Sequence, residues 1–268
     1  MNKKSISAII LTYNEEQNLE ACLKSIAGLV SQIIVVDSYS SDKTLEIAKK
    51  FGARIEQRRF TNQAEQFNWA IDTLEIKGDW ILRLDADEWL TPELSREIAD
   101  TLSRESAYAG FMMKRRVYFM GNWIKHGGYY PVSFLRLFKK GVGRSEVREM
   151  DEHIILHEGN EIGTLKNDFV DENHNGLARW IEKHKNYAER EARAYVKELH
   201  AEGGARERSA KLDAYYKLPI FLRPFLYFVY RYIIRLGFLD GVGGLVFHFL
   251  QGFWYRFLID IKIYQISK

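Results

Sequence analysis

Apolar runs and helical repeats alternate along the first ninety residues, and this alternation limits the possible folds more than any other feature. Strand-like runs are expected at residues 5–11, 32–36, 53–57 and 80–84, with helices between them. The runs suit strands covered on both faces, whereas the helices show apolar residues at spacings of three and four. Strands that alternate with helices form a parallel sheet with right-handed crossovers. We therefore predict an α/β fold for this part of the chain.

Polar side chains follow three of these predicted strands directly where each strand ends. Ligands of parallel sheets bind beyond the carboxyl ends of the strands, so these clusters are expected to meet at one edge. Asn14 is also expected to begin the first helix as its N-cap, with Gln17 three positions later as in a capping box. The clusters comprise residues 12–15, 37–42 and 85–87.

Two carboxylates, Asp85 and Asp87, follow the fourth predicted strand with one small residue between them. Buried carboxylates are costly unless something neutralises them, and these two repel each other at neutral pH. A divalent cation such as Mg²⁺ or Mn²⁺ prefers carboxylate and phosphate oxygens and usually completes its shell with substrate phosphates. We predict a metal site that holds a phosphorylated substrate, and an acidic turn without a metal is the alternative.

The pattern changes after residue 100. Residues 110–119 and 133–138 are expected to form antiparallel strands, and residues 121–130 between them are rich in glycine and aromatic side chains. That composition suits a pliable loop that stacks on a sugar-like face, or a surface hairpin loop. Residues 177–199 predict a long amphipathic helix.

Asp151 and Glu152 stand beside His153, between two strand-like runs. Adjacent carboxylates next to a histidine are able to supply a general base. A solvated turn is the alternative interpretation of the same residues.

Composition and cysteine usage indicate a folded protein of a reducing compartment. The chain of 268 residues is 46% hydrophobic and 28% charged, which fits a globular protein and excludes a disordered one. Its single cysteine, Cys22, excludes an intrachain disulfide. No signal-peptide pattern precedes the first strand, so we expect the catalytic part in the cytoplasm.

The C-terminal part is basic and aromatic. Residues 211–268 hold eight Lys or Arg and three Asp, a net charge of +5, and 16 of the 37 aromatic residues. Such a composition suggests nucleic acid or a membrane surface as partner. Its Phe, Leu and Ile content favours helices in the headgroup region of an anionic membrane, and its arginines argue against a span. Completion of the core and a homodimer interface are the alternatives.

Three motifs together resemble the family 2 glycosyltransferases, which have the GT-A fold. Their order and spacing match that family, and the chain is most similar to bacterial enzymes of lipopolysaccharide core or related surface-glycan assembly. The motifs are Ile-Leu-Thr-Tyr-Asn-Glu-Glu at 10–16, Val-Val-Asp-Ser-Tyr-Ser-Ser-Asp-Lys-Thr at 35–44 and Leu-Asp-Ala-Asp-Glu at 84–88.

The resemblance implies a fold and a division into domains. The fold class is α/β, with a GT-A (Rossmann-like) mixed sheet flanked by helices and a C-terminal amphipathic helical extension. Residues 1–200 would form the GT-A domain, with a nucleotide-binding half at 1–100 and an acceptor-binding half at 101–200. Residues 201–210 would be a linker, and residues 211–268 a membrane-associating extension.

The resemblance also assigns roles to single residues. The chain departs from the family at Phe67, which replaces the arginine that usually precedes the family's asparagine and contacts the diphosphate. Asp42 either shares the role of its turn or only caps its helix. The implied donor site comprises Thr12, Tyr13 and Glu15 along the base and ribose, Asp37 on the base, Ser40 in the same turn, Asn68 near the family's asparagine, Asp85 on the ribose or metal, and Asp87 on the metal.

The implied reaction is transfer of a hexose from a nucleotide-diphosphate sugar, with a UDP-sugar as the expected donor. Glu152 or Asp151 would act as the base in a single displacement that inverts the anomeric centre. A glycolipid or lipid-linked oligosaccharide would be the acceptor, on the cytoplasmic face of the inner membrane, and nucleic acid is not an expected partner. The alternative is a non-catalytic sugar-nucleotide-binding or scaffold protein with the same fold. A nicotinamide-dependent dehydrogenase is set aside because the first turn lacks Gly-x-Gly-x-x-Gly.

Overall fold

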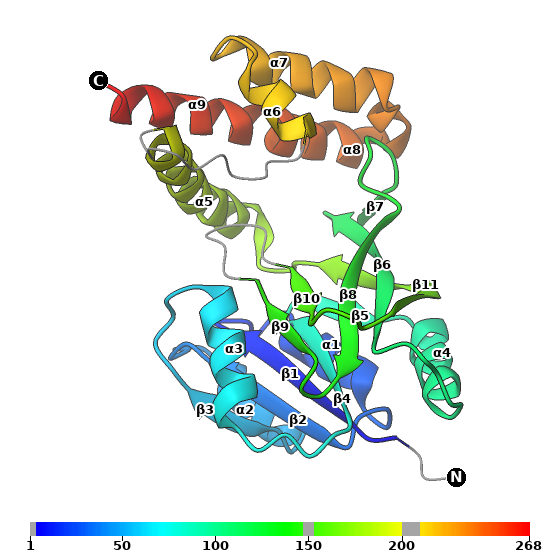
Figure 1. The fold of residues 1–268 in the computed structure, drawn as a ribbon. Coiled ribbons are helices and arrows are strands. Elements are labelled where there is room, and N and C mark those ends of the chain that lie inside the picture. The colour runs from blue at the N-terminus through cyan, green and yellow to red at the C-terminus, as the bar shows by residue number, and fades with distance from the viewer. Residues whose placement is uncertain (1–3, 147–152, 200–209) are drawn as a thin grey trace. The chain divides into compact units, whose positions relative to one another are not determined.

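The computed structural model describes residues 4–146, 153–199 and 210–268 (Figure 1). Two compact units make up the chain, and each is described by itself. The first unit comprises Met1–Tyr118 and Pro131–Asn175, and the second comprises Phe119–Tyr130 and Gly176–Lys268.

The first ninety residues form the expected parallel part of a sheet. Strand β1 lies between β2 and β4 and is parallel to both, and β3 extends the sheet beyond β2. The alternation of strands and helices is therefore confirmed. The elements are β1 (Ile6–Thr12), α1 (Leu19–Ile26), β2 (Gln32–Asp37), α2 (Thr44–Lys50), β3 (Arg54–Gln57), α3 (Gln63–Thr73), β4 (Trp80–Asp85), β5 (Glu88–Leu90) and α4 (Pro92–Leu102).

The later strands make the sheet mixed. Strand β8 is antiparallel to both β4 and β6, and β11 pairs parallel with β6 and antiparallel with β5. The strand order is β3-β2-β1-β4-β8-β6-β11-β5. This mixed sheet flanked by helices confirms the predicted fold class. The remaining strands are β6 (Gly110–Phe119), β7 (Asn122–Ile124), β8 (Val132–Lys139), β9 (Gly143–Ser145), β10 (Ile154–Leu156) and β11 (Ile162–Glu172).

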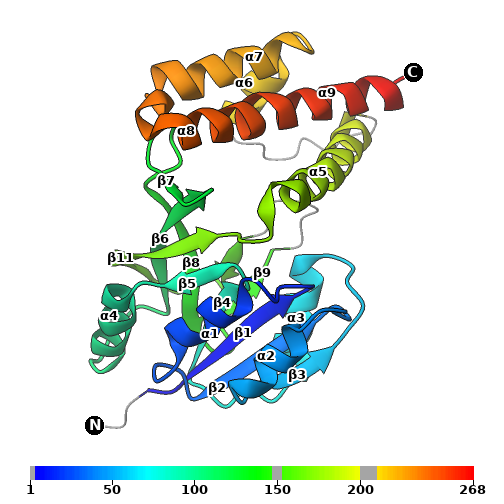
Figure 2. The same cartoon turned by 180° about the vertical axis from the view of Figure 1, so that it is seen from behind.

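Two apolar cores lie on the opposite faces of this sheet, because neighbouring side chains of a strand point to opposite faces. On one face, Ala8 and Ile10 pack with buried side chains of α1, α2 and α4. On the other face, Ile9 packs with Phe67 and Ala70 of α3. Figure 1 and Figure 2 show the sheet from these two sides. Both faces are covered, which explains why the strands read as continuous apolar runs.

The start of α1 differs from the prediction. Helix α1 begins at Leu19 after Asn18, whereas Asn14 has a φ of +54° and lies in a turn. The backbone oxygen of Glu15 accepts hydrogen bonds from the N–H groups of Asn18 and Leu19, which closes this turn. The prediction of Asn14 as N-cap was wrong, because asparagine also tolerates the left-handed conformation that the turn requires. Strand β5 was not predicted.

The second unit is built mainly of helices. Helix α5 packs on α9 through Ala188, Ala192 and Ile259, and Arg223 forms a buried ion pair with Asp260 at 2.5 Å. This packing places α5 with the C-terminal helices, whereas the sequence analysis placed residues 177–199 in the N-terminal domain. The elements are α5 (Gly176–Leu199), α6 (Ala210–Tyr216), α7 (Leu222–Val229), the π-helical turn η1 (Tyr230–Ile234), the 3₁₀ turn η2 (Gly237–Asp240), α8 (Gly241–Phe247), the π-helical turn η3 (His248–Trp254) and α9 (Tyr255–Ile266).

Within the residues that the structure describes, no single helix has the length and apolar composition of a membrane span. One pair of helical segments, Leu222–Ile234 and Gly237–Ile266, meets the length and composition criteria together but is bent by 71°.

Candidate active site

The sheet register brings the three predicted polar clusters to one edge. Thr12 at the end of β1 lies opposite Asp37 at the end of β2, and Leu11 lies opposite Asp85 at the end of β4. These positions are the carboxyl ends of adjacent parallel strands, where such sheets bind ligands. Residues that are far apart in the sequence therefore share one site.

Asp37 is the buried centre of the first turn system. Its carboxylate accepts hydrogen bonds from Thr12 Oγ1 at 3.0 Å, from the Ser40 N–H at 2.9 Å, from Ser40 Oγ at 2.5 Å and from Gln57 Nε2 at 3.1 Å. Four donors compensate the desolvation of this carboxylate and fix its orientation. Asp37, Thr12 and Ser40, all predicted site residues, thus form one hydrogen-bonded group.

Asn14 joins the turn after β1 to the turn after β2. Its N–H donates to Ser40 Oγ at 2.8 Å, and its Oδ1 accepts from the Ser41 N–H at 2.7 Å. Tyr13 and Tyr39, on these two turns, are 56% and 55% exposed. Tyr39 was not singled out from the sequence, although an aromatic residue between serines after a strand is a usable signal. The two turns thus offer exposed rings beside a rigid polar group.

Glu15 is held by protein partners at the same edge. Its Oε2 accepts from Asn18 Nδ2 at 2.6 Å and from Asn175 Nδ2 at 3.2 Å, and its N–H donates to Thr44 Oγ1 at 2.7 Å. Its carboxylate is therefore tied to α1 and to the end of the first unit.

Asp42 holds the start of α2 from the position before Lys43, the N-cap residue of that helix. Its Oδ1 accepts from the N–H of Thr44 at 3.0 Å and from Thr44 Oγ1 at 2.5 Å, and its Oδ2 accepts from the Glu16 N–H at 3.1 Å. Because Thr44 is the first residue of α2, these bonds fix the start of that helix.

Asp85 lies beside two buried arginines that the sequence analysis missed. Its Oδ2 is 3.3 Å from Arg136 Nη2, and its Oδ1 is 3.9 Å from Arg83 Nη2. Arg136 also forms an ion pair with the buried Glu88, whose Oε2 accepts from the Asp85 N–H at 3.1 Å. Burial raises the pKa of the Glu88 carboxyl, and the Arg136 guanidinium acts against this rise. Asp85 is therefore fixed in a network of alternating charges.

Asp87 is positioned by the segment after β11. Its Oδ2 accepts from Asn173 Nδ2 at 2.9 Å, and its backbone oxygen accepts from the Glu172 N–H at 3.0 Å. His174, which follows Asn173, donates its N–H to Asn18 Oδ1 at 2.8 Å. This segment was not predicted as part of the site, although a run of polar residues after a strand was the available signal.

Asn68 is engaged in a structural contact. It is buried, and its side-chain amide exchanges two hydrogen bonds of 2.9 Å with the backbone of Ser145. Arg83 Nη1 lies 3.5 Å from Ser145 Oγ, and the Arg83 guanidinium lies 5.3 Å from the centre of the Phe67 ring. Asn68 thus joins α3 to β9, and its predicted donor contact stays a prediction.

Two carboxylates are the candidate ligands for a metal ion. Within residues 4–146, 153–199 and 210–268, no group of three His, Cys, Asp or Glu side chains is arranged to hold a metal ion. Mg²⁺ and Mn²⁺ are commonly held by one or two carboxylates together with substrate phosphates, so Asp85 and Asp87 fit such an ion by donor chemistry. The predicted base residues, Asp151 and Glu152, lie outside the described residues.

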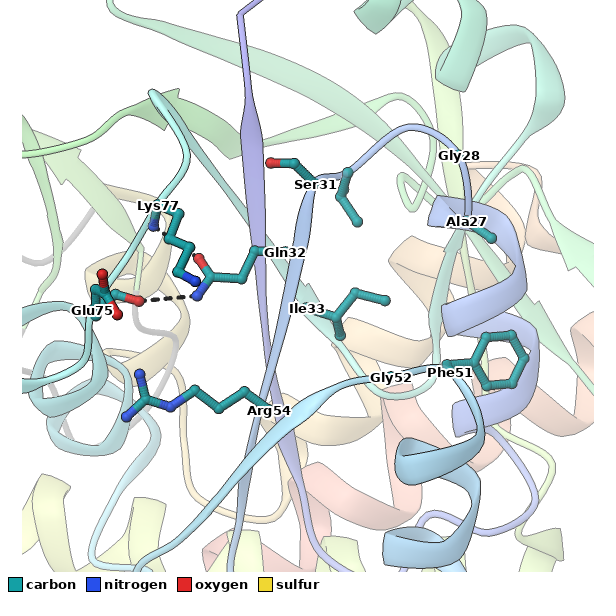
Figure 3. Close-up of a pocket in the computed structure, with 11 residues that line it drawn as sticks. Ala27, Gly28, Ser31, Gln32, Ile33, Phe51, Gly52, Arg54, Glu75 and Lys77 are labelled. Carbon is teal, nitrogen blue, oxygen red and sulfur yellow. Dashed lines mark hydrogen bonds between the residues drawn. The ribbon is translucent and has the colours of Figure 1, made fainter.

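A separate cavity of about 560 Å³ lies at the other edge of the sheet (Figure 3). It is lined by Gln32 and Arg54, at the starts of β2 and β3, and by Lys77 before β4. Gln32 Nε2 donates to the Glu75 backbone oxygen at 3.0 Å, and Gln32 Oε1 accepts from the Lys77 N–H at 2.9 Å. Because it lies at the amino ends of the strands, this cavity is distinct from the site at Asp37 and Asp85.

This chain is similar to one known protein along almost its whole length and to others along a part of it. A protein of Rhizobium meliloti, described as lipopolysaccharide core biosynthesis glycosyltransferase LpsC, is 28% identical over 98% of this chain and 93% of its own length. An uncharacterized glycosyltransferase of Rickettsia bellii is 42% identical over 35% of this chain and 32% of its own length. The chain covers between about a third and a half of the length of this protein and three other rickettsial relatives.

The chain is also similar to a solved structure and matches the sequence model of a family. Glucosyl-3-phosphoglycerate synthase of Mycobacterium tuberculosis, solved with Mn²⁺, UDP and glucosyl-3-phosphoglycerate, is 23% identical over 43% of this chain and 44% of its own, with a TM-score of 0.35. The sequence model of glycosyl transferase family 2 matches residues 7–152, which is more than half of the chain and includes the edge that holds Asp37, Asp85 and Asp87. The chain belongs to glycosyl transferase family 2.

Proposed function

We propose that this glycosyltransferase moves a hexose from a nucleotide-diphosphate sugar, with UDP as the nucleotide, to a lipid-linked or lipopolysaccharide-type acceptor. The observation that carries the proposal is the meeting of the Asp37 turn with Asp85 at the carboxyl edge of three adjacent parallel strands. One end of this edge offers hydrogen-bonding groups and exposed rings, and the other offers carboxylates. A nucleotide diphosphate needs both, since its base is planar and its phosphates are held through a divalent ion that carboxylates bind.

The turn side of the edge is the proposed nucleotide site. Thr12, Asp37 and Ser40 form a rigid polar group, and Tyr13 presents an exposed ring next to it. A preformed site of this kind loses little conformational entropy when the ligand binds. Glu15 is held by two amides and completes the wall near the ribose.

Asp87 and Asp85 are the proposed ligands of Mg²⁺ or Mn²⁺. When bound, a divalent ion neutralises the charge that develops on the departing nucleotide diphosphate. The chain itself orients both carboxylates, Asp87 through Asn173 and Asp85 through Arg136. Residues that hydrogen-bond to metal ligands orient those ligands, and their loss commonly lowers the affinity for the metal.

Glu152 or Asp151 is the proposed base that takes the proton from the acceptor hydroxyl. A single displacement by that hydroxyl inverts the anomeric centre. The lipopolysaccharide-related acceptor is supported by the description of the relative that aligns along almost the whole chain. The alternative, a non-catalytic sugar-nucleotide-binding protein, predicts donor binding without turnover.

Membrane contact through the second unit is part of the proposal. Its helices expose many large apolar side chains, among them Ile234 and Val242, at 65% and 79%. An enzyme at the cytoplasmic face of the inner membrane would share that surface with a lipid-linked acceptor. A homodimer interface is the competing use of these side chains.

Asp87→Ala tests the metal role in a calorimetric titration with UDP in the presence and absence of Mn²⁺. We expect Mn²⁺ to raise the affinity of the unmodified protein for UDP and to have no effect in the variant. Asp100→Ala is the matched control, because Asp100 is an exposed acid of the same unit, on α4. Equal Mn²⁺ dependence in Asp87→Ala would refute the assignment.

Glu152→Gln tests the base. The variant is expected to bind UDP and Mn²⁺ normally while transfer falls by about 10²- to 10⁴-fold, the usual contribution of general base catalysis. Asp151→Asn serves as the paired variant, and whichever of the two retains full turnover is not the base. Absence of turnover in the unmodified protein, with every sugar nucleotide of a panel and with lipid acceptors, would favour the non-catalytic alternative.

A further inference from the structure

We propose that the second unit contains a binding site for the phosphate group of a membrane lipid. The site is formed by the glycine pair Gly127 and Gly128, in the loop after β7, and by Arg231 and Arg235 at and after η1. This inference rests on the membrane contact proposed above and names the headgroup chemistry that the contact recognises. It does not depend on the transfer reaction of the first unit.

Two guanidinium groups converge on Gly128. A Cβ atom at this glycine would lie 3.1 Å from Arg231 Nη1 and 3.4 Å from Arg235 Nη2. Gly128 has a φ of +77°, and Gly127 before it has a φ of +66°, so both are in the left-handed region that glycine adopts without strain. Because Gly128 has no side chain, both guanidinium groups approach its backbone closely and lie near each other.

Neither arginine has an acidic partner among the residues that the structure describes. Within the described ranges 4–146, 153–199 and 210–268, no carboxylate lies within ion-pair distance of Arg231 or Arg235. Arg231 lies over the rings of Tyr129 and Tyr227, at 4.1 Å and 5.2 Å, and its buried Nε has no hydrogen-bond partner. Guanidinium groups bind phosphate oxygens through paired N–H donors, so a phosphate would satisfy both cations.

The charged and titratable neighbours described below do not neutralise the positive charge of Arg231 and Arg235. Asp240 is engaged with His126, accepting from its N–H at 2.9 Å and lying 2.6 Å from its Nδ1. His248 is fully buried, and burial lowers its pKa to about 4, so its ring is neutral near pH 7. Lys125 extends over the ring of Trp123 at 4.3 Å and adds a further positive charge to the loop.

The loop is fixed against the helical turns before any ligand binds. The N–H of Gly127 donates to the backbone oxygen of Arg235 at 2.8 Å, and a Cβ at Gly127 would lie only 2.0 Å from His248 Cε1. Figure 1 and Figure 2 show the loop that follows β7 beside α8. A site that is already assembled binds without the cost of ordering its parts.

The surroundings favour a lipid over a soluble phosphate or a nucleic acid. Four charged side chains lie between Leu218 and Gln251, and one of them, Arg235, is exposed. Arg231 is half-buried, and the side chains of Arg223 and Asp240 are buried. Nucleic-acid surfaces require several exposed cations. Cations at headgroup level with apolar side chains beside them are typical of interfacial helices. The exposed apolar neighbours are Ile233, Ile234, Leu236, Leu239 and Val242.

Arg235→Gln tests the site by co-sedimentation of the full chain with vesicles. Two vesicle types of equal surface charge are compared, phosphatidylcholine with phosphatidic acid and phosphatidylcholine with cholesteryl hemisuccinate. We expect the variant to bind phosphatidic acid vesicles about tenfold more weakly, as is typical for loss of a charge-assisted hydrogen bond. Binding to hemisuccinate vesicles is expected to change by less than about threefold, the scale of a general charge effect.

Arg193→Gln is the matched control, because it also removes one cation from the second unit but lies on α5 and is 71% exposed. It is expected to behave like the unmodified protein with both vesicle types. Arg235→Lys keeps the charge and removes the paired donors, so it should reproduce most of the loss and serves if the glutamine variant fails to fold. Circular dichroism checks the folding of each.

Four outcomes would overturn the inference. The first is absence of vesicle binding by the unmodified protein, the second is an equal loss with both vesicle types, and the third is an equal loss in Arg193→Gln. The fourth is that glycerol 3-phosphate or an oligonucleotide binds as tightly as vesicles do and depends on Arg235 to the same extent. The first also removes the proposed membrane contact, whereas UDP and Mn²⁺ binding by the first unit is measured separately and is unaffected by any of them.

Discussion

Two regions of the chain surround a pair of neighbouring arginines in opposite ways. At the end of β4, Arg83 and Arg136 face the carboxylates of Asp85 and Glu88, so the positive charges are balanced by the protein. After η1, Arg231 and Arg235 face a glycine and aromatic rings. In the first region the arginines orient an acid that we propose as a metal ligand, and in the second the two cations are left for the proposed phosphate. The two regions thus differ in whether the protein itself supplies the counter-charge.

Arg136→Met should give the largest effect on stability. It leaves Glu88 buried without a counter-charge, which typically costs about 3–5 kcal/mol. The free energy of unfolding in urea, followed by tryptophan fluorescence, measures the loss. The double variant Arg136→Met with Glu88→Gln should recover part of it, because the buried carboxylate is then removed together with its counter-charge. If Arg136→Met alone is as stable as the original chain, the ion pair of Arg136 with Glu88 does not stabilise the first unit.

Lowering the pH should destabilise the second unit through His248. The pKa of an unfolded histidine is about 6.5, and burial lowers that of His248 to about 4. Between these values only the unfolded chain binds the proton, so stability is complete above about pH 6.5 and falls as the pH drops toward about 4. The loss at about pH 5 should be on the order of 2 kcal/mol. Titration of the ring in NMR spectra near its ordinary pKa would contradict this.

Gly127→Ala should destabilise the loop that carries the proposed phosphate site. The new Cβ would meet the His248 ring at 2.0 Å at a positive φ, and overpacking of this kind costs about 1–3 kcal/mol. Gly159→Ala is the control, because Gly159 also has a positive φ, +81°, but nothing lies within 4 Å of the new atom. Thermal unfolding should separate the two variants. Equal losses would mean that backbone strain alone is responsible and that the contact with His248 is unimportant.

Arg235→Gln should have the smallest effect on stability, within about 0.5 kcal/mol, which is usual for an exposed residue that forms no ion pair with the described part of the chain. The contrast with Arg136→Met sharpens the comparison, since both remove one arginine and only one removes an ion pair. A loss of several kcal/mol in urea unfolding would show that Arg235 has a structural role in place of a ligand-binding one.

Much of the fold was predictable from local sequence patterns. Strands β1, β2 and β4 and their polar ends follow from apolar runs that stop at Thr12, Asp37 and Asp85, because burial on both faces imposes such runs. The antiparallel strands β6 and β8 were also predicted and are confirmed. The start of α1 was not, because Asn14 suits both an N-cap and a left-handed turn, and only the contact with Ser40 decides between them.

The partners of the acidic pair were beyond reach of the sequence. Arg136 is on β8 and Asn173 follows β11, so their proximity to Asp85 and Asp87 depends on the order of strands in the sheet. Strand order is a property of long-range packing, and no local pattern specifies it. Of the predicted donor residues, Asn68 has the same difficulty, since its contact with Ser145 joins segments 77 residues apart.

The dependence of Asp87 on Asn173 has a consequence for how the protein is made. Strand β5, which follows the acidic pair, lies at the end of the sheet order next to β11. While the chain emerges from a ribosome, β5 has no neighbour on that side until residues 162–172 have been synthesised. A fragment cut at residue 152, the end of the family match, would keep the whole motif and lack the strand that holds it. The acidic pair is therefore among the last parts of the first unit to be assembled.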